Sequence, residues 1–152
     1  MSYEELLEKR IIEPVEISSE ETADLLRVVR RDIRTAKSLI TMDLDWAFAI
    51  AYNAVLQLTI AWMNSLGYRP RGEAKHMNAF IFLEETLPEE RQPMIKRLQR
   101  MRRKRNATVY RQRGLVSEKE ALDVIEFAIQ YYRDIETLLP ARIISLSVDD
   151  DN

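Results

Sequence analysis

The chain is notable first for the residue types that it lacks. Its 152 residues include no cysteine, three glycines and a single histidine. Without cysteine the chain forms no disulfide, holds no metal through thiolates and has no cysteine nucleophile. Glycine is scarce, and no stretch alternates apolar and polar residues as half-buried strands do. These absences favour an all-α protein.

Long apolar runs are also scarce. The one run of membrane-spanning length, Trp46 to Met63, is interrupted by Asn53 and Gln57. Amphipathic segments flank it, so we expect a buried core helix rather than a membrane span. The first residues lack the basic and then apolar pattern of a secretory signal, which predicts a cytoplasmic location.

Apolar residues recur at helical spacing in four long segments and one short one. The expected helix starts carry capping patterns or a first-turn proline: Ser18 with Glu21, Asp43 or Asp45, Pro93, and Ser117 with Glu120. They predict helices over about 19–41, 46–66, 93–112 and 118–139, with a short helix over 74–83. Gly67 is expected to end the second long helix, and 68–72 to form a loop. The connections are short, which predicts an up-and-down four-helix bundle with an extra short helix.

The length predicts one domain over residues 1–152. Its core bundle covers about 19–139. Residues 1–17 are expected to form a helical turn followed by an extended link. Residues 141–152 form a tail whose apolar part is expected to pack on a partner subunit, and whose acidic end is expected to be disordered.

Positive charge is concentrated in residues 91–113. This stretch contains ten basic residues and no acidic one, so the other 129 residues carry a net charge of −12. Such a concentration indicates an anionic partner at one face. The alternative is a helix whose charges are solvated or paired with acidic neighbours in the same fold. The arginines of the 19–41 helix are expected to form a solvated face.

A compact polar group lies late in this basic stretch. Its apolar stripe of Met94, Leu98 and Met101 continues with Arg105, where a core residue is expected. Asn106 and Tyr110 lie within the next turn or so. A planar guanidinium suits a two-pronged grip on a phosphate. Arg102, Arg103 and Arg111 would attract a nucleic-acid backbone. The alternative is that Arg105 pairs with a buried group of another helix.

Three more polar residues are candidates for the lining of a crevice: Asn53, Gln57 and His76. The two amides either bond to neighbouring helices or face Arg105. His76 falls in the first turn of the short helix and is either structural or part of a site. No second histidine and no cysteine accompanies it, so no metal site is expected.

Three short motifs, in order, resemble the HEPN family of helical-bundle domains, which often occur beside minimal nucleotidyltransferases. The motifs are Ala51-Tyr52-Asn53-Ala54, the segment 67–72 followed by His76, and Arg105-Asn106-x-x-x-Tyr110. The resemblance covers about residues 19–139. It implies a HEPN-like bundle, a homodimer and a metal-independent endoribonuclease without a cofactor. The active site would be composite, at the dimer interface, and many members are toxins neutralised by a nucleotidyltransferase partner.

Carried over, Arg105 matches the motif arginine of the family and Asn106 the polar residue after it. Tyr110 stands where active members have histidine. An unperturbed tyrosine is a poor base at neutral pH. Three functions therefore stay open: an endoribonuclease with Arg105, Asn106 and Tyr110 as catalytic residues, a non-catalytic dimer that binds RNA or nucleotide or docks a nucleotidyltransferase, and a structural dimer.

Overall fold

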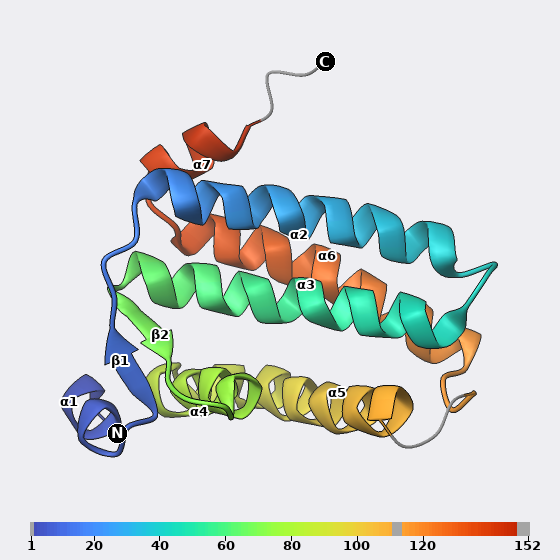
Figure 1. The fold of residues 1–152 in the computed structure, drawn as a ribbon, viewed down its shortest axis with the longest axis horizontal. Helices are drawn as coiled ribbons and strands as arrows, with labels where there is room; N and C mark the ends of the chain where they lie inside the picture. Colours follow the sequence, from blue (N-terminus) through green and yellow to red (C-terminus); the bar gives the residue numbers. More distant parts are fainter. Residues whose placement is uncertain (1, 111–113, 149–152) are drawn as a thin grey trace.

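The computed structural model of the protein describes residues 2–110 and 114–148, apart from the side chains of Val109 and Tyr110. Within these ranges the chain is mostly helical, with two short strands (Figure 1). In chain order the elements are α1 (Tyr3–Glu8), β1 (Ile12–Pro14), α2 (Ser19–Leu39), α3 (Leu44–Ser65), β2 (Tyr68–Pro70), α4 (Lys75–Thr86), the 3₁₀ turn η1 (Glu89–Arg91), α5 (Gln92–Tyr110), α6 (Glu118–Leu138) and α7 (Ala141–Ser147).

Three of the four long helices begin after cap residues that the sequence predicted, and α5 begins at Gln92, one residue before the predicted first position, Pro93. The side chain of Ser18 accepts the backbone N–H of Glu21 at 3.1 Å and starts α2. Asp43 rather than Asp45 caps α3. Ser117 forms a complete capping box that starts α6. These bonds satisfy backbone donors that have no partner inside the helix.

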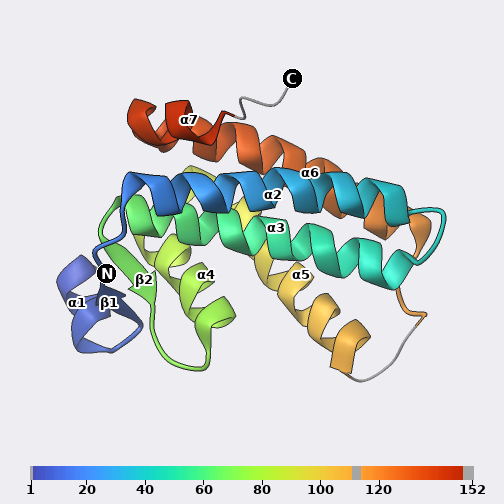
Figure 2. The same ribbon diagram turned by 45° about the horizontal axis from the view of Figure 1, so that its top comes forward.

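The middle of the bundle is α3. It packs against α2 and α6 on one side and against α4 and α5 on the other (Figures 1 and 2). Tyr52, Leu58 and Met63 are among its fully buried side chains. By length and composition alone α3 could cross a membrane, but 67 % of its most apolar stretch of 18 residues is buried inside the fold. A helix that is apolar on every face is what a central position requires.

A small two-stranded sheet departs from the all-α expectation. β1 pairs antiparallel with β2, with Ile12 opposite Pro70 and Glu13 opposite Arg69. The first strand lies in the segment expected to be a link, and the second in the expected loop 68–72. Each strand has three residues, too few to show an alternating pattern.

Two boundaries in the middle of the chain also differ from expectation. α4 continues to Thr86, beyond the expected end of the short helix at 83, and η1 lies in the connection between α4 and α5. The predicted end of the basic helix near Gln112 lies outside the described residues.

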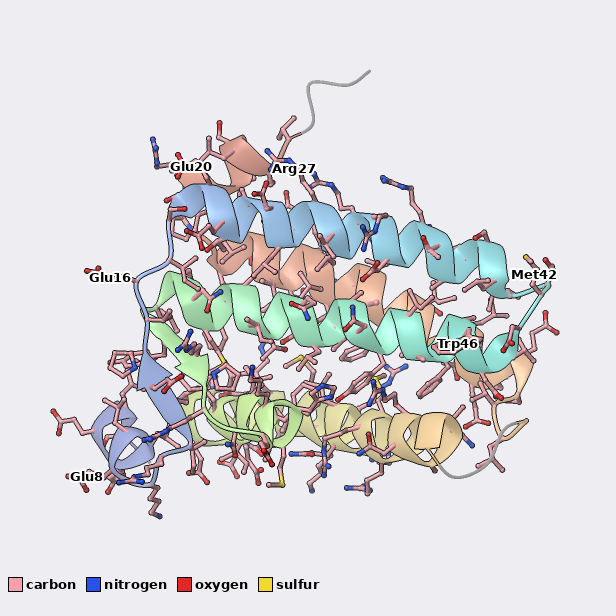
Figure 3. The ribbon with its side chains drawn as sticks, in the orientation of Figure 1. Glu8, Glu16, Glu20, Arg27, Met42 and Trp46 are labelled. Atoms are coloured by element: carbon pink, nitrogen blue, oxygen red, sulfur yellow. The ribbon has the colours of Figure 1, made fainter. Side chains whose placement is uncertain are left out.

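The tail folds back on its own chain, and the expectation that its apolar part packs on a partner subunit stays a prediction. α7 lies along α2, and Ile143 is buried there. Arg27 projects from α2 toward α7 (Figure 3), where it donates to the carbonyl of Leu146; Arg30 donates to that of Ser147. The last carbonyls of a helix lack internal partners, and cations are favourable at that end. These two arginines are therefore not part of a merely solvated face. The acidic end, 149–152, lies outside the described residues.

Candidate functional site

Arg105 continues the apolar stripe of α5 and lies against the central helix, α3. The buried members of this stripe include Ile95, Leu98 and Met101. One turn further, the guanidinium carbon of Arg105 lies 6.0 Å from the ring centroid of Tyr52 on α3. Arg105 is half-buried and donates to the side-chain oxygen of Asn106 at 3.4 Å. An arginine in a core stripe is thus accommodated against the face of an aromatic ring.

The same tyrosine contacts the only histidine. The hydroxyl of Tyr52 lies 3.2 Å from Nδ1 of His76, the second residue of α4. Phe80, one turn along α4, is fully buried with its ring edge-on to Tyr52 at 6.2 Å between centroids. Phe80 anchors α4 to α3, and this packing holds His76 beside the tyrosine. We call Tyr52, His76, Arg102 and Arg105 the His76 cluster.

The cluster is positively charged and holds its imidazole neutral. Burial lowers the pKa of His76 below its ordinary value of 6.5, and the cations Arg105 and Arg102 lower it further. Burial raises the pKa of the Tyr52 phenol, against a weaker opposite effect of the two arginines. At neutral pH the phenol and the imidazole are therefore uncharged beside two guanidinium groups. Such a site favours an anion.

Beyond the cluster, the outer side of α5 presents a row of exposed cations. Lys96, Arg100 and Arg103 follow one another at spacings of four and three residues, which places them on one face. Glu84 lines the same hollow of about 290 Å³, yet in the described part of the chain no carboxylate forms an ion pair with any of the three. We call these three residues the cationic ridge.

The side of α5 that faces α6 is different. Arg91, the last residue of η1 before α5, pairs with Asp134 at 3.8 Å, and Lys104 pairs with Glu120 at 3.2 Å. Arg97 lies over the ring of Phe127, 4.8 Å from its centroid. The alternative reading of the basic stretch, pairing inside the fold, therefore holds for this side of the helix and not for the ridge.

The predicted site residues divide between the cluster and other places. Arg105 and Arg102 belong to the cluster, and Arg102 is half-buried with its Nε donating to Gln99 at 3.0 Å. Arg103 lies on the ridge. The side chain of Tyr110 and all of Arg111 lie outside the described residues.

The polar residues of α3 are not all placed as the crevice hypothesis required. Asn53 donates to Asp32 of α2 at 3.0 Å, and Arg31 donates to the same carboxylate at 3.2 Å. Asn53 therefore bonds to a neighbouring helix, α2, which is the first of the two alternatives given above for the amides. Gln57, one turn further along α3, is half-buried.

The sequence reasoning missed the role of Tyr52. It appeared only within the motif Ala51-Tyr52-Asn53-Ala54, on a helix that is apolar throughout, where a buried aromatic residue is expected from packing alone. Its position beside Asn53 was the only signal that could have drawn attention to it.

The described residues contain no group of three or more histidine, aspartate and glutamate side chains arranged to hold a metal ion. The His76 cluster offers two guanidinium groups instead, and these repel cations.

Comparison with known proteins adds no identification. No protein-family model matches the chain, and no curated protein or solved structure is similar to it at a significant level.

Proposed function

We propose that the protein is a HEPN-type RNA-binding protein that holds the phosphate backbone of single-stranded RNA along α5. The observation that carries the proposal is the approach of His76, Tyr52 and Arg105 from three different helices. The guanidinium of Arg105 supplies the planar donor pair for one phosphate. The cationic ridge lies on the other side of α5 from Arg105, and it supplies sequence-independent attraction for more distant phosphates of the same strand.

The length of the ridge favours an RNA strand over a single nucleotide. Lys96 to Arg103 covers seven residues of helix, which is about 10 Å along the axis. The ridge and the cluster together are longer than one phosphate group. A chain of phosphates uses all of these cations, whereas a nucleotide uses only a few.

The proposal includes the finer features that the resemblance implies. α2, α3, α5 and α6 are the four long helices of a HEPN-like up-and-down bundle. Two copies form a homodimer in the cytoplasm, with their α5 motifs facing each other. A nucleotidyltransferase partner neutralises the protein if it is a toxin. Size-exclusion chromatography with light scattering tests the dimer, and a clean monomer removes the composite site.

A second candidate function is metal-independent cleavage of the bound RNA. It is favoured by one specific observation: His76 brings an imidazole next to Arg105, although Tyr110 occupies the histidine position of the motif. Arg105 would hold the scissile phosphate, with Asn106 beside it. His76 would then supply the imidazole that the α5 motif lacks.

Binding is tested with fluorescent single-stranded RNA in the presence of EDTA. Arg105→Ala removes charge-assisted hydrogen bonds and is expected to weaken binding by about tenfold or more. Arg105→Lys keeps the charge but loses the planar fork, so it should restore binding only in part. Arg34→Ala, an exposed arginine on α2, is the matched control. Equal affinity in Arg105→Ala and Arg34→Ala would reject the site.

Cleavage is read from the same mixtures on a gel. If the protein is an endoribonuclease, His76→Ala should leave the RNA intact even at protein concentrations high enough to saturate it. Cleavage that persists in both His76→Ala and Arg105→Ala would come from a contaminant, and the protein would then be a binding module only.

A further inference from the structure

We propose that Tyr52 is a positioning residue that holds His76 in the tautomer with its proton on Nε2, so that His76 meets a phosphate as a hydrogen-bond donor. The identity of the ligand rests on the proposed function. The tautomer rests on the contacts of the cluster alone, and the two parts can be tested separately.

The first argument is the hydrogen-bonding capacity of the buried phenol. The side chain of Tyr52 is 1 % exposed, and within the described residues its hydroxyl has one hydrogen-bond partner, Nδ1 of His76. If Nδ1 carried the proton, the imidazole would donate and the phenol hydrogen would be left buried without an acceptor. An unmade bond of a buried donor is costly. The satisfied arrangement has the phenol donating to a bare Nδ1, and the imidazole proton is then on Nε2.

The second argument is that both groups stay uncharged. The groups that face His76 are Tyr52 from α3 and the two arginines, Arg102 and Arg105, from α5. Burial and these cations lower the pKa of His76, while burial raises that of Tyr52. The pair therefore remains a neutral phenol donating to a neutral imidazole through the neutral pH range.

The third argument is rigidity. Tyr52 lies in the middle of the central helix, between the edge of Phe80 and the guanidinium of Arg105. Its hydroxyl is thereby held in place, and it fixes the orientation of the imidazole. A ring held at Nδ1 directs Nε2 away from Tyr52. The half-buried His76 then carries its N–H on the edge opposite the tyrosine.

The consequence concerns the chemistry of His76. In this tautomer Nε2 has no lone pair with which to accept a proton, so it does not act as a base at that nitrogen. A neutral imidazole can instead donate its N–H to an oxygen of a phosphate held by Arg105. This assigns His76 to ligand binding and to stabilising charge on the phosphate oxygen.

The deciding experiment is a long-range ¹H–¹⁵N correlation spectrum of the ¹⁵N-labelled protein above pH 7. Since His76 is the only histidine, the imidazole signals need no assignment. We expect the pattern of a single Nε2–H tautomer in the wild type and a shift toward a mixture in Tyr52→Phe. Tyr131→Phe is the matched control, because it removes another buried phenol, one bonded to Thr59 at 2.7 Å. A wild-type Nδ1–H tautomer, or a pattern unchanged by Tyr52→Phe, would overturn the proposal.

Two substitutions of His76 test the donor role in RNA binding. The side-chain amide of glutamine reaches the position of Nε2, whereas that of asparagine reaches the position of Nδ1. His76→Gln should keep most of the RNA affinity, and His76→Asn should lose about tenfold. Equal affinities would overturn the donor role. If no variant and no wild-type protein binds RNA but the Nε2–H tautomer is found, the proposed function fails and the positioning by Tyr52 stands.

Discussion

Replacing Arg100 and Arg103 with glutamine should lower the salt dependence of RNA binding. Both arginines are exposed on the cationic ridge, and within the described ranges neither forms an ion pair. Their charges are therefore not used by the fold. Glutamine keeps a long polar side chain with good helix propensity, so α5 should be preserved.

The magnitude follows from the release of counterions. Each contact with a phosphate of a single strand contributes about 0.7 to the slope of log affinity against log salt concentration. Two lost contacts should lower the slope by about 1.4. If the affinities of the two proteins converge near 1 M salt, the variant should bind about 25-fold more weakly at 0.1 M.

The assay is a fluorescence anisotropy titration with one single-stranded RNA at several salt concentrations. Arg34→Gln with Lys37→Gln on α2 is the matched control, because these residues are also exposed, three apart and cationic. The control should keep the wild-type slope. An unchanged slope in the ridge variant would refute the contact with RNA, and an equal decrease in both variants would show that only net charge matters.

Three further predictions concern folding. Because the pKa of His76 is lowered in the folded chain, the unfolded chain binds the proton first as the pH falls through 6.5. The free energy of unfolding in urea should therefore decrease in this range, and it should decrease less in His76→Gln. Parallel curves of stability against pH for the two proteins would contradict this. Ser117→Ala removes the cap of α6 and should lower the free energy of unfolding by about 1 kcal/mol in urea denaturation, with the circular dichroism of the native state unchanged. Ile143→Ala leaves a cavity between α7 and α2 and should cost about 2–4 kcal/mol in the same assay; no loss would mean that α7 is not docked in solution.

The helices were accessible from the sequence because their signals are local. The caps at Ser18, Asp43 and Ser117 are bonds between residues three apart, and the apolar stripes repeat within one helix. The helical turn near the N-terminus and the short helix with His76 in its first turn were accessible for the same reason. The unusual position of Arg105 in its stripe was also visible, since only the spacing on α5 is needed to see it.

Which segments contact these helices could not be predicted, because those contacts join segments that are far apart in the sequence. The pairing of β1 with β2 joins the strand that precedes α2 to the strand that follows α3, and two arginines of α2 bond to carbonyls of α7. No local pattern contains either contact, because which side chains meet is set by how whole helices and strands approach one another.

The basic stretch and its odd arginine were thus determined by the sequence alone, and the surroundings of that arginine were not. Tyr52 and Asn53 are neighbours in the chain, yet one meets His76 beside Arg105 and the other bonds to α2. Successive residues of a helix point about 100° apart, so the rotation of α3 in the bundle decides which of them enters the cluster. That rotation is set by the packing of α3 against α2, α4, α5 and α6 together, and it exists only in the tertiary structure.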